Sequence, residues 1–171
     1  MKTFLSTAVI MAMATTSAMA NQCTNITKEE VDAAQKEWGQ GIVAIGQSEN
    51  PKAAAENHLD TLYGYEIGNV LFKPTKAKED QFRNTREKAL SYFVKGVIPE
   101  DKGFALAPFT NVRFENKSSI IDCDSALAMG NYYFTTQEGK DVKVEYSFGY
   151  VKDEEGKLKI NLHHSSLPYQ S

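Results

Sequence analysis

The period of the hydrophobic pattern changes once along the 171-residue chain, near residue 104. Before that point apolar residues recur at helical spacing. After it they alternate with polar residues, as in strands with one buried face. Two short glycine-containing segments, 137–139 and 153–156, separate the last three alternating stretches and are typical of β-hairpins. Helices followed by an antiparallel meander predict an α+β fold, with the helices on one face of a bent sheet.

Three helices are predicted in the first part of the chain. The first spans 28–47 and begins with a capping box, in which Thr27 and Glu30 would each accept a backbone N–H from the other. The second begins at Pro51, a residue that suits the first turn of a helix. The third spans 78–95, where apolar residues again form one stripe.

Strands are predicted in the second part, together with one extended segment in the first. That early segment, 65–72, is rich in aromatic and β-branched residues and ends before Pro74. The four predicted strands cover 106–115, 125–135, 142–151 and 158–166.

The first 20 residues predict a secretory signal peptide. Lys2 precedes an uncharged and mostly apolar run, and a small-x-small pattern at 18–20 comes directly before Asn21. No other stretch is long and apolar enough to cross a bilayer. We therefore expect a periplasmic or secreted protein without a membrane partner, with a single mature domain over 21–171.

Charge and cysteine content narrow the possible partners. The chain carries a formal net charge of −3, or −4 once the leader is removed. Nucleic-acid binding needs a basic surface, so no nucleic-acid partner is expected. An exported compartment permits a disulfide between Cys23 and Cys123, and two free structural thiols are the alternative.

The last predicted strand ends in four polar side chains, at positions 163–166. Strict alternation from Leu158 places His164 and Ser166 on the apolar face, and His163 and Ser165 on the other. An unpaired buried polar group costs about 1–3 kcal/mol, so the inward pair must meet protein groups, water or a ligand. The pattern alone allows a hydrogen-bonded strand end as well as a site.

The histidine and cysteine spacings match no metal motif. His58 is the third histidine, and it belongs to a predicted helix far from the other two in sequence. Neither an HxxxH nor a CxxC spacing occurs.

A series of short motifs runs in order along the chain, after a first helix that carries tryptophan. The motifs are Leu71-Phe-Lys-Pro-Thr75, Ser91-Tyr-Phe93, Gly130-Asn-Tyr-Tyr-Phe-Thr135, Val144-Glu-Tyr-Ser-Phe-Gly-Tyr-Val151 and His163-His-Ser-Ser-Leu-Pro168. Together they resemble bacterial proteins similar to the association domain of calmodulin-dependent protein kinase. Those proteins belong to the superfamily of nuclear transport factor and ketosteroid isomerase. More narrowly, the terminal motif with the upstream Pro-Thr and Tyr-Phe pairs resembles the iota-class carbonic anhydrases. Leu167 stands where that class usually has methionine.

The resemblance implies a cone-shaped, nuclear-transport-factor-like fold with a pocket at its open end. In the iota class that pocket binds bicarbonate through hydroxyl groups. Carried over by motif, Thr75 and Tyr92 would line it, with one histidine and one serine of the terminal motif; the motif does not say which. The alternation of apolar residues in the last predicted strand selects His164 and Ser166 from this motif. The expected site residues are Thr75, Tyr92, His164 and Ser166, with His163 and Ser165 as secondary candidates.

The function predicted on these grounds is that of an exported carbonic anhydrase acting on carbon dioxide and bicarbonate. Thr75, Tyr92 and Ser166 would position the reactants, as hydroxyl groups that stabilise developing charge can do. His164, with an ordinary pKa near ~6.5, would accept or relay the proton. Some iota-class members work without metal, so no cofactor is expected; a metal site concealed from the spacing is the alternative.

Two other classes of function fit the same fold. The first is a non-catalytic module that binds a small ligand or assembles through the open sheet. The second is an isomerase or hydrolase, which needs a pocket carboxylate; only Asp60 and Asp122 are loose candidates. For all of these functions, a homodimer is expected from the fold if the outer face of the sheet is apolar.

Overall fold

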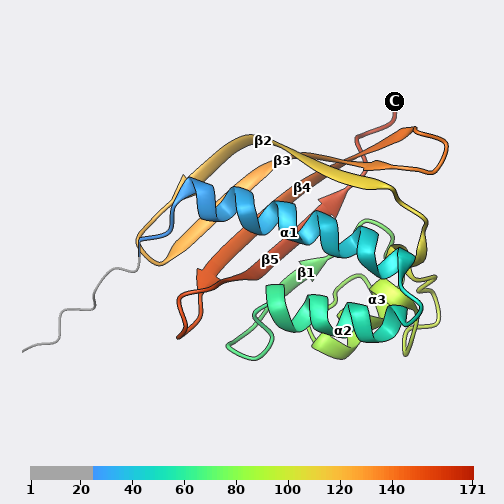
Figure 1. Ribbon diagram of the computed structural model, residues 1–171, viewed down its shortest axis with the longest axis horizontal. Coiled ribbons are helices and arrows are strands. Elements are labelled where there is room, and N and C mark those ends of the chain that lie inside the picture. Colours follow the sequence, from blue (N-terminus) through green and yellow to red (C-terminus); the bar gives the residue numbers. More distant parts are fainter. Residues whose placement is uncertain (1–24) are drawn as a thin grey trace, which may run out of the picture.

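The computed structural model of the protein describes residues 25–171. The predicted signal peptide and Cys23, and with them any Cys23–Cys123 pairing, lie outside the described residues. Three helices and a 3-10 turn accompany a five-stranded sheet (Figure 1). The elements in order are α1 Lys28–Gln47, α2 Pro51–Leu62, β1 Leu71–Lys73, α3 Arg86–Val94, η1 Phe104–Leu106, β2 Asn111–Ile121, β3 Ser125–Thr135, β4 Asp141–Lys152 and β5 Leu158–Ser166. No helix within 25–171 is long and apolar enough to span a membrane.

The strand order in the sheet is β1-β5-β4-β3-β2. Strands β2 to β5 form the predicted antiparallel meander, and β1 joins β5 in parallel. Helix α1 lies across one face of this twisted sheet, while α2 and α3 pack near β1 (Figure 1). The predicted α+β class is therefore confirmed.

The first two helices form as their sequences predict. Thr27 and Glu30 make both hydrogen bonds of the capping box, and Asn50 caps α2 with Pro51 in its first turn. The inward stripe of α1 centres on Trp38, which is 1% exposed and contacts aromatic rings from β2, β3, β4 and β5. This contact fixes the helix against the sheet.

The prediction of the third helix was wrong for its first half. Residues 78–85 form an irregular loop, and α3 begins at Arg86 behind the N-cap Thr85. The loop N–H groups find a partner outside any helix, because the Glu100 carboxylate accepts hydrogen bonds from residues 78–80. Because the Glu100 carboxylate accepts from these N–H groups, the loop does not need the hydrogen bonds of a helix.

Two extended segments also differ from their predicted bounds. Only Leu71–Lys73 of the early segment pairs as a strand, and a turn occupies most of what precedes it. Residues 104–106 form η1, and β2 runs over Asn111–Ile121 instead of 106–115.

A β-bulge interrupts β5 and reverses its alternation. Gly149 pairs with Leu162 while Tyr150 pairs with Ile160, so Asn161 is the extra residue. A β-carbon at Gly149 would lie 2.7 Å from the Asn161 Oδ1 atom, so glycine makes room for the bulge. Every side chain after Asn161 consequently faces opposite to the direction that strict alternation predicts.

Candidate functional site

The bulge turns His163 and Ser165 into the interior of the cone. Their side chains belong to residues only 2% and 4% exposed, whereas His164 is exposed. The prediction that His164 and Ser166 face inward was therefore wrong. The two secondary candidates occupy the inner positions.

A chain of hydrogen bonds links His163 to the first helix. Trp38 Nε1 donates to the Tyr63 hydroxyl over 2.9 Å, and that hydroxyl lies 2.8 Å from His163 Nδ1. The hydrogen of the Tyr63 hydroxyl has no other acceptor among residues 25–171, so we assign it as donated to Nδ1. The Nε2 atom of His163 then carries the hydrogen, and it is buried without a partner among residues 25–171. His163 thus presents an unused N–H donor inside the cone.

Three hydroxyl groups meet beside His163. Thr75, which follows β1, donates from Oγ1 to Ser165 Oγ over 2.8 Å. The parallel pairing of β1 with β5, which sets Lys73 opposite His164, brings these two distant segments together. Tyr132 from β3 is the third: burial raises the pKa of its hydroxyl, and hydrogen bonding to Ser165 and Thr75 opposes that rise. Since Ser165 accepts from Thr75, its own hydrogen can be donated to the Tyr132 oxygen or to a ligand.

Tyr92 lies between this hydroxyl cluster and a cavity at the surface. Its ring is 5% exposed and stacks on Phe104, with centroids 5.4 Å apart. Its hydroxyl accepts the backbone N–H of Lys76, the neighbour of Thr75, over 3.4 Å. Burial raises the pKa of Tyr92 well above its ordinary value, so the group stays protonated. Tyr92 also lines a cavity of about 340 Å³ that we call the Tyr92 cavity; its other lining residues are Lys76, Glu100, Asp101, Lys102, Gly103, Phe104, Leu106 and Ala107.

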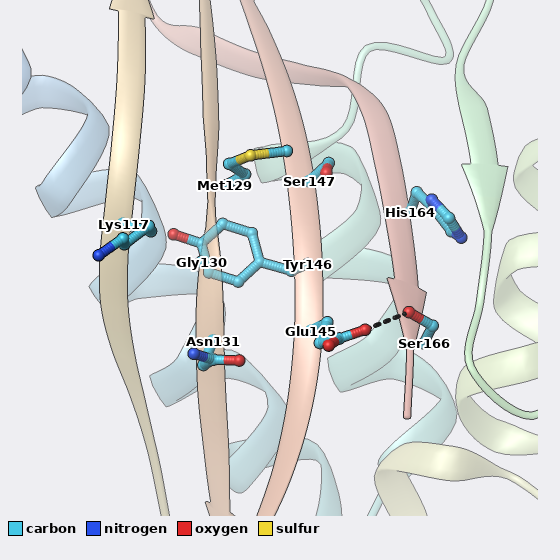
Figure 2. A pocket seen from close by; sticks show the side chains of 9 residues that line it. All are labelled: Lys117, Met129, Gly130, Asn131, Glu145, Tyr146, Ser147, His164 and Ser166. Carbon is cyan, nitrogen blue, oxygen red and sulfur yellow. Dashed lines mark hydrogen bonds between the residues drawn. The ribbon is translucent and has the colours of Figure 1, made fainter. Parts of the chain in front are cut away.

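His164 and Ser166 lie on the outer face of the sheet instead. Figure 2 shows Ser166 beside Glu145, with its hydroxyl donating to Glu145 Oε2 over 3.1 Å, and His164 further along β5. They line an open cavity of about 350 Å³, which we call the outer cavity; its remaining residues are Lys117, Met129, Gly130, Asn131, Tyr146 and Ser147. The side chains predicted to share one site are thus divided between the two faces of the sheet.

Both buried histidines are uncharged at neutral pH. Burial lowers the pKa of His58 to about 3. Burial is the largest cause that lowers the pKa of His163 well below its ordinary value, and electrostatic contributions from His58 and His164 add to it. His163 therefore acts as a neutral imidazole, and its lone pair at Nδ1 is used by Tyr63.

These shifts predict a pH-dependent stability. In the unfolded chain both histidines titrate near pH ~6.5, so below that pH the unfolded state binds more protons. The free energy of unfolding should rise with pH up to about 6.5 and then level off. At pH 5.5 it should be lower than at pH 7.5 by about 1.4 kcal/mol for each histidine. Urea denaturation at the two pH values measures this, and His58→Gln should remove about half of the difference. Equal stability of the parent at both pH values would contradict the burial of neutral histidines.

The sequence reasoning missed Trp38, Tyr63 and Tyr132 as parts of the site. Tyr132 lies within the Gly130–Thr135 motif, so the motif was a signal for it. Tyr63 follows α2 directly and offered no pattern of its own. The loose carboxylate candidates do not join the cluster: Asp60 forms an ion pair with Arg86, and Asp122 is exposed. Across the described part of the chain, no three His, Cys, Asp or Glu residues are placed to hold a metal ion.

Comparison with known proteins gives concordant results. The family described as metal-independent carbonic anhydrase matches residues 29–167. A metal-independent carbonic anhydrase from Nostoc sp. strain PCC 7120 is 46% identical over 154 residues, which is 85% of this chain and 75% of the relative.

Two solved structures share the fold. The crystal structure of the iota-carbonic anhydrase from a cyanobacterium, complexed with bicarbonate, has 40% identity and a TM-score of 0.83. That match covers 98% of this chain and 100% of the other. A calcium/calmodulin-dependent protein kinase II association domain from Xanthomonas campestris has 26% identity and a TM-score of 0.58, over 93% and 100% of the two chains.

Proposed function

The chain belongs to the metal-independent carbonic anhydrase family and is thereby a carbonic anhydrase, and we propose that it interconverts carbon dioxide and bicarbonate at the inner end of β5. The residues of this site are Thr75, Tyr92, Tyr132, His163 and Ser165. The observation that carries the proposal is the buried hydroxyl cluster beside an unused imidazole N–H. The bicarbonate in the similar cyanobacterial enzyme supports the choice of ligand.

The site offers hydrogen-bond donors where charge develops. As water attacks the carbon, negative charge builds on the oxygens of carbon dioxide. The hydroxyl hydrogen of Ser165 and the Nε2–H of His163 can stabilise that charge, because buried donors act in a medium of low dielectric constant. Thr75 and Tyr92 orient the reactants. The family is metal-independent, which supports a site without a metal cofactor.

His163 is a poor candidate for the proton acceptor. Its Nδ1 lone pair already accepts from Tyr63, and burial keeps the imidazole neutral. His164, predicted for this task, lies on the other side of the sheet. Another group must therefore accept the proton that the attacking water loses.

The proposed function is tested by stopped-flow carbon dioxide hydration, using residues 21–171 with and without a strong chelator. We expect hydration above the buffer rate that survives chelation. Activity lost to the chelator would overturn the metal-free proposal. No activity in either condition would leave a non-catalytic binding module of the same fold.

A homodimer through the outer face of the sheet belongs to the same proposal. Ile120, Leu127 and Met129 are exposed there by 68%, 49% and 53%, and exposed apolar clusters of this kind mark interfaces. Analytical ultracentrifugation should show a dimer at micromolar concentration, and Met129→Glu should convert it to a monomer. Ile67→Glu, a matched change at an exposed isoleucine in the turn before β1, should leave it dimeric. A monomeric parent would contradict this.

Export remains a proposal from the sequence alone. The leader over 1–20 supports a periplasmic or secreted location. Expression of the full chain, followed by fractionation and mass spectrometry of the amino terminus, should find Asn21 as the first residue outside the cytoplasm.

A further inference from the structure

One row of residues across the inner face of the sheet leads away from the site. The strand pairing sets Tyr146 of β4 opposite Ser165 of β5. On its other side Tyr146 lies opposite Gly130, which in turn lies opposite Asn116 of the edge strand β2. Side chains of directly paired residues point to the same face, with β-carbons about 4.5–5.5 Å apart. Tyr146 is therefore the direct neighbour of Ser165, and the site described above does not use it.

The ring of Tyr146 leans along this row, away from Ser165. Figure 2 shows it reaching from β4 toward β3 and β2, on the side away from β5. Gly130 leaves this direction open because it has no side chain. A β-carbon there would lie 2.1 Å from the Glu115 carbonyl oxygen, so the position requires glycine. Tyr146 is 3% exposed, and its ring centroid lies 5.1–5.3 Å from those of Phe114, Tyr132 and Phe148.

Two amide side chains, Gln35 and Asn116, fix the Tyr146 hydroxyl at the far end of the row; we call them the amide pair. The hydroxyl donates to Asn116 Oδ1 and accepts from Gln35 Nε2 over 3.3 Å. The two amides also bind each other: Gln35 Nε2 donates to Asn116 Oδ1 over 2.9 Å, and Asn116 Nδ2 donates to Gln35 Oε1 over 2.7 Å. Gln35 is 2% exposed and lies about one turn before Trp38 on the inward stripe of α1. The first helix thus orients Tyr146 as well as Tyr63.

We propose that Gln35 and Asn116 are positioning residues of the carbonic anhydrase reaction, which hold Tyr146 away from Ser165 and keep the bicarbonate position open. The inference rests on the proposed function. Another staggered χ1 rotamer of Tyr146 would turn its ring toward β5 and over the Ser165 hydroxyl. The ring would then exclude the ligand. The apparent affinity for the ligand would fall in proportion to the fraction of molecules that keep the open arrangement.

A structural role alone makes a different prediction. If the amide pair only joins α1 to β2, its loss lowers the stability and leaves KM unchanged in the molecules that remain folded. If it holds Tyr146 open, KM rises while kcat changes little, because saturating ligand selects the open molecules and these react as before. KM should then fall again when the side chain at position 146 is too short to cover Ser165.

The experiment measures bicarbonate dehydration by stopped flow in the parent, Gln35→Met and Gln40→Met. Gln35→Met keeps the length of the side chain and removes both of its hydrogen-bonding groups. We expect KM for bicarbonate to rise about three- to tenfold, with kcat within about twofold, because hydrogen bonds of ordinary strength are lost. Gln40→Met makes the same change at an exposed position of the same helix and should keep the KM of the parent.

Two further variants separate positioning from folding. Tyr146→Phe keeps the ring but cannot hydrogen-bond to the amide pair, so we expect a similar rise in KM. This variant carries the test if Gln35→Met does not fold. Gln35→Met combined with Tyr146→Val replaces the ring by a short side chain, so KM should return to within about twofold of the parent.

The possible failures are distinguishable. If the parent is active and both Gln35→Met and Tyr146→Phe keep its KM, the positioning role is wrong while the proposed function stands. A rise in KM that Tyr146→Val does not reverse, or one that Gln40→Met shares, also overturns the positioning role. A parent without activity overturns both.

Discussion

Ser165→Ala is expected to lower kcat/KM for carbon dioxide hydration by about 10²–10³-fold. The reason is that Ser165 is central to the hydroxyl cluster, where it accepts from Thr75. In the proposed reaction its own hydrogen is donated to the reacting oxygen. Loss of one preorganised donor to a developing oxyanion has an effect of about this size. Stopped-flow hydration at saturating buffer measures it, so that proton release does not limit the rate.

Ser166→Ala is the matched control for this change. It removes the same atom from the adjacent residue, whose hydroxyl contacts Glu145 on the outer face. We expect its kcat/KM to stay within about twofold of the parent. The reverse result, with Ser166→Ala impaired and Ser165→Ala unaffected, would place the site in the outer cavity, at the residues that strict alternation selected.

Trp38→Ala is expected to reduce the free energy of unfolding by about 3–5 kcal/mol. Trp38 fills the centre of the core, where its ring lies 5.5–6.2 Å from those of Phe114, Tyr132, Phe134, Phe148 and His163. The substitution leaves a large cavity and removes the N–H that orients the Tyr63 hydroxyl. Urea denaturation followed by circular dichroism measures the loss.

Trp38→Phe separates packing from hydrogen bonding. Phenylalanine retains most of the ring contacts but cannot donate to Tyr63. We expect a smaller loss of stability together with reduced activity, because His163 would no longer be held in one tautomer by the Tyr63 hydrogen bond. Full activity in a stable Trp38→Phe variant would show that this orientation is unnecessary.

Short-range sequence patterns predicted the helices and strands whose bounds depend on neighbouring residues. The capping box, the helical stripe and the two hairpin turns were sufficient for α1, α2 and the bounds of β3 and β5. The 78–85 loop was not predictable in this way, because its N–H groups depend on Glu100, about 20 residues further along the chain. Tertiary contacts overrode a pattern that was compatible with a helix.

Prediction of the site from the sequence depended on one detail, the register of β5 against β4. Motif resemblance brought Thr75, Tyr92 and the terminal histidines and serines together, but one residue, Asn161, decides which of them face inward. Period-two reasoning carries no information about a bulge, and a shift of one residue exchanges the two faces of a strand. Gly149 opposite Asn161 is the one sequence feature that permits the bulge, and its meaning emerges only once the pairing is known.

A crystal structure of the protein with bicarbonate tests the central claim most directly. We predict the anion inside the cone, within hydrogen-bond distance of the Ser165 hydroxyl and the His163 Nε2 atom, with Thr75 and Tyr92 beside it. Bicarbonate bound instead in the outer cavity, against His164 and Ser166, would contradict the assignment of the site to the inner face of β5.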